Sequence, residues 1–379
     1  MRYYFDHNAT TPVSPKVMAA FTQSTEHAYG NASSIHHFGQ AAKQRLESAR
    51  SSVAKFLNVQ PREIVFTSGG TESDNLAILG AVRASSKVRK HVITAAIEHP
   101  AVLAACDQLR SEGVEVSIVP VDRSGVVDPN AIRRELRPQT VLISVMHANN
   151  ETGVMQPIRE IASIGREGGV IVHCDGVQAA GRVPVDLREL GVDLYSLSAH
   201  KMNAPKGTGG LYVRNQITLR PLQVGGRHER ERRAGTENVP GAIALATACE
   251  LTRTTQTVAA LRDRLERGVL KRIPGATVNA GASERLPNTT NIRFGGLSGE
   301  ALVIALDLEG FAVSSGSACS SGSIEPSHVL LAMGLSDAEA RSSIRFSLGL
   351  GNDARQVDEL IDALEAVVTR SRREELARA

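Results

Sequence analysis

Short runs of β-favouring residues alternate with helix-length stretches between residues 62 and 213 of the chain. Several of these runs are almost continuously apolar, which is typical of strands that are buried on both faces. The stretches at 71–85, 100–112 and 158–167 are long enough to be crossover helices. This alternation predicts an α/β domain with a mostly parallel sheet. The expected strands are residues 63–67, 91–95, 114–119, 140–146, 170–174, 194–198 and 209–213.

The last third of the chain has a different pattern. Residues 241–272 are expected to form a long helix or a pair of helices, which Pro274 and Gly275 end. Because 379 residues exceed the size of one ordinary core, we expect two domains. The large domain is expected at 16–260, and a smaller α+β domain is expected to combine 1–15 with 261–379. After residue 275 the expected strands are 289–294, 312–314 and 343–348, and the expected helices are 299–309, 326–332 and 353–370.

Composition excludes several classes of protein. The net charge of +3 is weaker than the basic bias of most nucleic-acid-binding domains. Aromatic residues are only 3% of the chain, too few for surfaces that stack single-stranded nucleic acid. No apolar run approaches the roughly 18 residues of a membrane span, and the first residues lack a secretory-signal pattern. The four cysteines lie far apart, without zinc-ligand spacing, so we expect a thiol-reduced, cytoplasmic protein.

Ligands of parallel sheets bind at the carboxyl ends of the strands, so residues that follow strands are the candidates for a site. In FTSGGTESDN, Gly69 and Gly70 follow the first expected strand and Thr71 opens a helix. Glycines let a ligand approach the backbone, and the N–H groups of a helix N-terminus attract phosphate. A glycine turn with a threonine cap explains the same residues without a ligand.

Two later strands end in groups that suit a cofactor with a ring nitrogen and a carbonyl. Asp175 of DGVQ could hold a protonated ring nitrogen, with Gln178 about one helical turn further on, although an Asp N-cap is the competing explanation. The next strand delivers Ser198, His200 and Lys201. A partly desolvated lysine has a lowered pKa and can form a Schiff base. Lys206 is the local competitor, but Lys201 directly follows the apolar strand.

Further candidates lie on loops and on a late strand. His99 of EHP can act as an acid–base group near neutral pH. Asn149 and Asn150 of HANNETG offer amide groups to a polar ligand, and Arg345 of SSIRFSLG can hold a carboxylate in a bidentate contact. Each also has a purely structural explanation, as a loop histidine, turn residues or a solvent-facing arginine. Cys319 lies in SSGSACSSGS, whose small polar residues leave a thiol accessible and reactive.

Taken together, these groups compose a site for pyridoxal 5′-phosphate (PLP). The set contains a phosphate site, a carboxylate for the ring nitrogen, a Schiff-base lysine and a histidine that can stack on the ring. The carboxylate-binding arginine indicates an amino acid as substrate.

Over nearly its whole length, from YFDHNATTP to SSIRFSLG, the sequence resembles the cysteine desulfurases of the NifS/IscS kind, in the class V aminotransferase group. The resemblance rests on GGTESDN, EHP, NNETG, DGVQ, SAHK, RAGTEN and SSGSACSSGSIEPSHVL. It implies PLP fold type I, with a mostly parallel seven-stranded sheet in the large domain and a smaller α+β C-terminal domain. The implied reaction converts L-cysteine to L-alanine and leaves a persulfide on Cys319, which is passed to acceptors for iron–sulfur cluster assembly or other sulfur-containing molecules.

The resemblance also implies a role for each candidate. Lys201 would bind the cofactor, Asp175 and Gln178 would contact the pyridine nitrogen and ring hydroxyl, and His99 would stack on the ring and move protons. Asn150 would contact the substrate carboxylate together with Arg345. The implied phosphate-binding residues are Gly70, Thr71, Ser198, His200 and, from the neighbouring subunit of a homodimer, Thr236 of RAGTEN.

The acceptor thiol implied by the resemblance is Cys319, in a loop at about 314–326 of the small domain. No resident metal is implied, apart from transient iron–sulfur ligation by that thiol. An iron–sulfur scaffold protein is one implied acceptor. The chain ends soon after its last expected helix, whereas housekeeping relatives carry a longer tail that helps to dock this scaffold, so the acceptor stays open.

Two departures and three alternatives accompany the resemblance. Gly176 stands where alanine is usual, and MNAPKG follows Lys201 where relatives have bulkier residues. A selenocysteine lyase or a small-amino-acid aminotransferase of the same fold are the nearest alternatives. A sulfur-carrier protein that uses Cys319 without a cofactor is a third, against which Lys201, Asp175 and Arg345 together argue.

Overall fold

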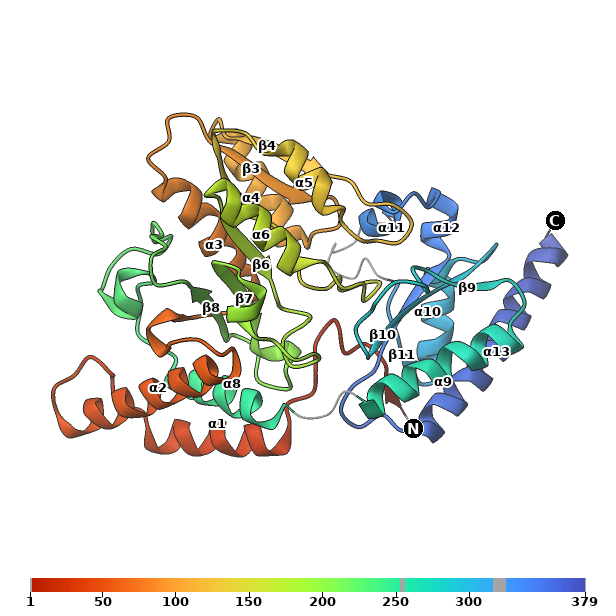
Figure 1. Ribbon diagram of the computed structural model, residues 1–379. Coiled ribbons are helices and arrows are strands. Elements are labelled where there is room, and N and C mark those ends of the chain that lie inside the picture. Colours follow the sequence, from red (N-terminus) through yellow and green to blue (C-terminus); the bar gives the residue numbers. More distant parts are fainter. Residues whose placement is uncertain (1, 253–255, 316–324, 379) are drawn as a thin grey trace.

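The structure is a computed structural model that describes residues 2–252, 256–315 and 325–378 (Figure 1). Cys319 therefore lies outside the described residues. The apolar residues gather around two separate sheets. One is a seven-stranded sheet in the first two thirds of the chain, and the other is a small antiparallel sheet near the C-terminus. Among the described residues, no helix is long and apolar enough to cross a membrane.

The seven-stranded sheet has the strand order β2-β8-β7-β6-β5-β3-β4. Strand β8 is antiparallel to β2 and β7, and the remaining neighbours are parallel. This arrangement confirms the α/β prediction. The strands are β2 (Ile64–Thr67), β3 (His91–Ala95), β4 (Glu115–Val119), β5 (Thr140–Ser144), β6 (Ile171–Asp175), β7 (Leu194–Ser198) and β8 (Gly209–Val213).

Alternate residues of these strands enter two apolar clusters, one on each face of the sheet. Val65 and Leu194 join one cluster with helices α3 (Gly70–Ala84) and α4 (Pro100–Ser111). Ile64 and Tyr195 join the other, which includes residues of α2 (His37–Phe56), α6 (Ile158–Gly168) and α8 (Val239–Leu251). Both faces are therefore covered, which explains why the central strands read as continuous apolar runs.

Shorter elements complete this part of the chain. Helix α1 (Pro15–His27) and helix α2 pack against α8 (Figure 1). The other short helices are α5 (Pro129–Glu135), α7 (Leu187–Leu190) and the 3₁₀ turns η1 (Pro61–Glu63), η2 (Ala199–Lys201) and η3 (His228–Glu231). The expected helix or helix pair at 241–272 is a pair, α8 followed by α9 (Gln256–Arg272).

The second part of the chain is built on an antiparallel sheet of order β12-β10-β9. Its apolar core includes Phe5, Leu265, Phe294 and Leu364, and α9 packs against α13. Strand β1 (Tyr3–Tyr4) pairs in parallel with β11 (Phe311–Ala312). The remaining elements are β9 (Ala276–Val278), β10 (Thr289–Phe294), β12 (Ser343–Ser347), α10 (Gly299–Leu308), α11 (His328–Ala332), α12 (Asp337–Arg341) and α13 (Ala354–Arg378).

We propose that the two domains divide between α8 and α9, a few residues before the expected position 260. Helix α8 contributes Leu245 to the first core, whereas α9 contributes Leu261 and Leu265 to the second. At the N-terminus, Phe5 belongs to the second core and Val17 to the first. The chain between these two residues therefore passes from one core to the other, and it borders the candidate site.

Candidate active site

The N-terminal segment 6–11 places the backbone around Lys201. The lysine follows β7 in the turn η2, and its Nζ donates to the carbonyls of Asn8 and Ala9, the latter at 2.7 Å. Thr11 holds the same segment against η2, because its N–H and hydroxyl both donate to the carbonyl of His200. The backbone carbonyls of segment 6–11 thus hold the amine of Lys201 in place. The sequence analysis quoted this segment only as part of a motif and assigned it no role.

Asp175 lies at the end of β6, and its carboxylate is buried. Oδ1 accepts from the N–H of Val177 at 2.9 Å. Burial raises the pKa of this carboxyl, and the nearby charges of His99 and Lys201 act in the opposite direction. The three groups therefore lie within electrostatic reach of one another, as expected for one site.

Gln178 is oriented from both ends by buried groups. Its Nε2 donates to the carbonyl of Asn8 at 3.1 Å, and its Oε1 accepts from Arg182 at 2.7 Å. Arg182 is itself buried and also donates to the carbonyl of His7. Burial lowers the pKa of Arg182 to about 10, and the charge of Arg345 acts in the same direction. The sequence analysis did not single out Arg182, because its role depends on contacts distant in sequence.

Ser198 and the glycines before α3 form a small polar pocket. Ser198 is buried, and among the described residues its Oγ has no hydrogen-bond partner. An atom at the Cβ position of Gly69 would lie 3.9 Å from this oxygen, and one at Gly70 would lie 2.7 Å from Cγ2 of Val177. Gly70 is therefore fixed as glycine by space. A buried hydroxyl without a partner beside a helix N-terminus suits an oxyanion such as a phosphate.

His99 caps helix α4, where its Nδ1 accepts from the N–H of Ala101 at 3.1 Å. Burial lowers the pKa of His99, and the nearby groups Lys201 and His328 lower it further. Asp175 acts in the opposite direction and raises it. The hydrogen bond to Ala101 fixes the tautomer, so the other ring nitrogen carries the proton in the neutral form. The structure therefore presents a neutral histidine ring whose remaining N–H is free of the helix cap.

Arg345 projects from β12 and brings the second part of the chain to the site. One Nη donates to Asp6 at 2.7 Å and the other to the carbonyl of Asn150 at 3.1 Å. Its Nε is buried and has no hydrogen-bond partner within the described ranges. Asn149, by contrast, accepts from the backbone of Glu151 and Thr152, so it stabilises the turn. Arg345 retains a donor for a further acceptor such as a carboxylate.

The segment that contains Cys319 is anchored at both described ends to this site. On one side, Ser314 and Arg345 exchange two backbone hydrogen bonds of 3.2 and 2.7 Å. On the other, the hydroxyl of Ser327 donates to Glu151, and Nε2 of His328 lies 2.9 Å from the carbonyl oxygen of Glu98. The described residues on both sides of 316–324 therefore lie beside residues expected to bind the substrate and the ring.

Two other candidates lie at the surface. Thr71, in the first turn of α3, and Thr236 are both exposed. His200 is different, because its Nδ1 is 3.1 Å from the hydroxyl of Thr10 and burial lowers its pKa to about 4. Arg233, close to Thr236 in sequence, pairs with Glu72 of α3 at 2.8 Å. The segment that carries Thr236 is therefore tied to the helix that opens at Gly70.

Sequence reasoning missed a buried polar chain beneath Asp175. Asp74 is fully buried, and its Oδ1 lies 3.6 Å from Nε2 of His173. That ring nitrogen is 3.0 Å from the hydroxyl of Ser196, and Nδ1 is 2.8 Å from that of Ser144. Burial raises the pKa of Asp74 well above its usual value and lowers that of His173 to about 3. In the sequence, only the position of His173, two residues before Asp175, could have indicated this group of buried polar side chains.

A cavity of about 640 Å³ lies on another side of Lys201. It is lined by Arg182 and Asn203, by residues of α1 and α8, and by residues 348–352. Of the expected cofactor-binding and substrate-binding side chains, only Lys201 borders it. The cavity therefore does not mark the place where Asp175, His99 and Ser198 meet, and we assign the site from those side chains.

Comparison with known proteins agrees with the architecture. The model of the family "Aminotransferase class-V" matches residues 3–360. A cysteine desulfurase IscS of Dictyoglomus turgidum is 46% identical over 374 residues, which cover 97% of this chain and 95% of the relative. A solved NifS-like protein has a TM-score of 0.91 at 37% identity, covering 97% of this chain and 100% of that one. The solved structure "SspA in complex with cysteine" has a TM-score of 0.83 at 34% identity, covering 92% and 99%.

The turn before Thr236 generates a test of stability. Glu229, Arg230 and Glu231 all have positive φ angles, and the carboxylate of Glu229 is buried against Arg50 at 2.7 and 2.8 Å. Burial lowers the pKa of Arg50, but the hydrogen bonds and charge of Glu229 outweigh it and raise the pKa overall. The ion pair therefore holds a strained turn in place.

We expect Glu229→Gln to lower the free energy of unfolding by about 3–5 kcal/mol, because it leaves a buried guanidinium without its full counter-charge. Glu231→Gln in the same turn is the control, since Glu231 and its partner Arg227 are exposed. That variant should stay within about 0.5 kcal/mol of the original protein. Urea unfolding measures the free energy of unfolding of both variants. Equal values would contradict the role of the Glu229–Arg50 ion pair in holding the turn.

Proposed function

The chain belongs to the class V aminotransferase family, and from that membership we propose that it is a PLP-dependent cysteine desulfurase. It removes sulfur from L-cysteine, releases L-alanine and carries the sulfur as a persulfide on Cys319. The observation that carries the proposal is the grouping of Asp175, Lys201, His99 and Ser198 at the carboxyl ends of neighbouring strands and at the start of α4. The relatives named above as cysteine desulfurases give the reaction its direction.

The residues present fit PLP. The unpartnered hydroxyl of Ser198 beside Gly70 suits the phosphate, and the buried carboxylate of Asp175 suits a protonated ring nitrogen. Lys201, which rests on the carbonyls of Asn8 and Ala9, is the amine that binds the aldehyde carbon. When bound, PLP supplies an electron sink for the bonds around the α-carbon of the amino acid.

The side chains divide the remaining work. Arg345 and Asn150 orient the α-carboxylate, for which the buried Nε of Arg345 is a spare donor. His99 and Lys201 hold or move the protons that leave the α-carbon and the thiol. The thiolate of Cys319 attacks the sulfur of cysteine, so that an S–S bond forms as the C–S bond breaks. The carbon then takes up a proton and leaves as alanine, and the persulfide stays on the protein.

We extend the proposal to partners and compartment. The exposed Thr236 is proposed to reach the phosphate of a second copy of the chain, which makes the functional unit a homodimer. A protein acceptor, such as an iron–sulfur scaffold, is proposed to receive the sulfur. The cytoplasm is the proposed compartment, where a reactive thiol such as that of Cys319 is kept reduced between turnovers.

Cys319→Ser separates sulfur transfer from the earlier steps. A hydroxyl is a far weaker nucleophile than a thiolate near neutral pH, so the variant should bind PLP and cysteine but form no persulfide. Mass spectrometry of the peptide after cysteine treatment without reductant should show one added sulfur in the original protein and none in the variant. Ser320→Ala, one residue away, is the control and should keep the added sulfur. Alanine production by Cys319→Ser at the original rate would mean that Cys319 is not the acceptor.

Lys201→Ala tests which lysine carries the cofactor. Borohydride treatment should fix PLP covalently on the original protein and on Lys206→Ala, but not on Lys201→Ala, because that amine is the one placed at the site. Peptide mapping identifies the labelled residue, and absorbance reports any cofactor that is held without a covalent bond. A label on Lys206 would overturn the assignment.

The shared phosphate site is tested by mixing two inactive proteins. Hybrids of Lys201→Ala with Thr236→Ala chains should hold one site with both lesions and one with neither. Random pairing then restores about a quarter of the original sites. Lys201→Ala mixed with Asp175→Asn is the control, because both lesions lie in the chain's own site and each hybrid site keeps one of them. Equal recovery in the two mixtures, or an active monomer in sedimentation, would contradict the shared site.

A further inference from the structure

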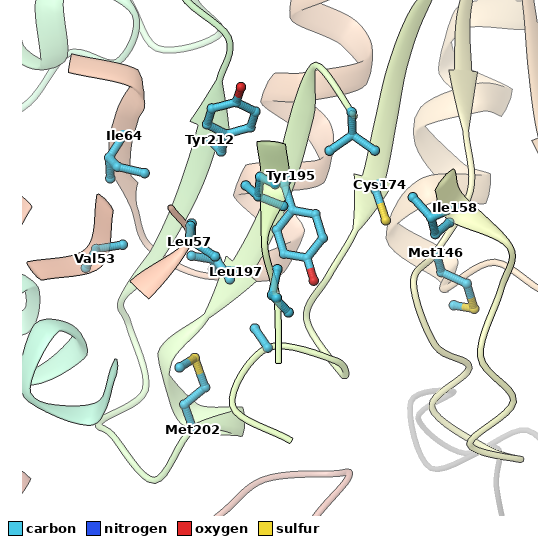
Figure 2. Close-up of a cluster of buried hydrophobic side chains, with 14 of the residues drawn as sticks. Val53, Leu57, Ile64, Met146, Ile158, Cys174, Tyr195, Leu197, Met202 and Tyr212 are labelled. Atoms are coloured by element: carbon cyan, nitrogen blue, oxygen red, sulfur yellow. The ribbon is translucent and has the colours of Figure 1, made fainter. Parts of the chain in front are cut away.

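Gly176 and Tyr195 fit together in the floor of the proposed cofactor site. Tyr195 of β7 is fully buried, and Figure 2 shows its ring in the midst of the apolar cluster on this face of the sheet. A Cβ atom built on Gly176 would lie 1.9 Å from Cζ of this ring and 2.4 Å from its hydroxyl oxygen. The φ angle of Gly176 is not positive. The residue is therefore glycine because the ring needs the space, and not because of its backbone conformation.

The hydroxyl of Tyr195 has one specific partner. It lies 2.9 Å from Nδ1 of His147, which is itself buried, and the two rings meet edge to face. Burial lowers the pKa of His147 to about 4 and raises that of Tyr195. The phenol therefore keeps its proton, and the hydrogen bond joins it to a neutral imidazole. The nearby charge of Asp175 also favours the neutral phenol.

His147 and the residue that follows Tyr195 are both joined by backbone hydrogen bonds to the peptide group between Asp175 and Gly176. The N–H of His147 donates to the carbonyl of Asp175 at 2.8 Å. The N–H of Gly176 donates to the carbonyl of Ser196, next to Tyr195, at 3.1 Å. The carbonyl of Gly176 in turn accepts from Ala179 and Ala180, which closes the turn that carries Gln178. The Tyr195–His147 pair thus links β7 to the chain that follows β5, beside the turn that follows β6.

We propose that Tyr195 is a positioning residue, which fills the space left by Gly176 and, through His147, sets the turn 175–178 that presents Asp175 and Gln178 to the cofactor. The inference rests on the proposed function, which gives those two side chains their role. It also accounts for the glycine at a position where alanine is usual in the resembling family. The chain has a matched pair at 176 and 195, in which the ring of Tyr195 requires a residue without a Cβ atom at 176.

The proposal is tested with a set of variants that are prepared as apo protein before PLP is added. Gly176→Ala should weaken PLP binding by at least about tenfold, because the methyl group must displace the ring and break the hydrogen bond to His147. Gly176→Ala combined with Tyr195→Leu should recover to within about threefold of the original affinity, since the smaller side chain leaves room for the methyl group. Tyr195→Phe keeps the ring and removes only the hydroxyl, so its loss should be smaller than that of Gly176→Ala.

Three measurements separate a positioning role from an effect on stability alone. Equilibrium dialysis gives the dissociation constant of PLP, and the pH titration of bound-cofactor absorbance reports the surroundings of Asp175. Urea midpoints of the apo proteins show what each variant costs the fold. A merely structural pair would shift the midpoints and leave the dissociation constant and the titration unchanged, and that result would overturn the inference.

The double variant keeps the test decisive when Gly176→Ala does not fold. In that case, a folded Gly176→Ala/Tyr195→Leu protein with original PLP affinity supports the matched pair. A double variant that also fails to fold, or that binds PLP at least about tenfold more weakly than the original protein, refutes it. Original protein that does not bind PLP at all would instead overturn the proposed function. Gly165→Ala is not a suitable control, because its Cβ would lie 2.2 Å from Val172. Gly168→Ala, whose Cβ would make only ordinary contacts of 3.5 Å or more, is the matched control.

Discussion

The hydrogen bonds of Asn8 join the two cores of the molecule at the proposed site. Its carbonyl accepts from Lys201 and Gln178, and its side chain bonds to Thr289, to Asn288 and to the carbonyl of Asn150. Its own N–H donates to the hydroxyl of Ser347. Asn8 can be buried because its own backbone and side-chain polar groups all have partners. The relative placement of Lys201 and Arg345, which come from different parts of the chain, depends on segment 6–11.

Burial also determines the protonation states of the ionisable side chains in and around the ends of the strands. It raises the pKa of the carboxyl groups of Asp74, Glu98 and Asp175, and it lowers the pKa of the imidazoles of His147 and His173. Groups of both kinds are therefore pushed toward their neutral forms. A cation placed against Asp175 reverses the effect on that carboxyl, because an opposite charge favours the ionised form. The site is thus arranged to take up a positive group at the end of β6.

Much of this arrangement could be predicted from local patterns, and the rest depended on contacts distant in sequence. The apolar runs predicted β3, β7 and β8 to the residue, because a strand buried on both faces has a strong compositional signal. Strand ends in turn led to Asp175 and Lys201. By contrast, Asn8, Arg182 and Asp74 gave no local signal, since each acts through partners that only folding brings near. The expected boundary at 260 lies inside α9, because the pattern at 241–272 fitted either a long helix or a pair of helices and did not locate the break between them.

The glycine at 176 shows how local and distant information differ. The sequence revealed it as a departure, but the reason lies in a ring from the neighbouring strand. In evolutionary terms, that contact imposes an order on substitutions. A tyrosine at 195 cannot enter while alanine occupies 176, whereas a glycine at 176 leaves only a small void beside a smaller residue at 195. The accessible path therefore runs through glycine first, and once tyrosine has followed, the return to alanine is closed until position 195 changes again.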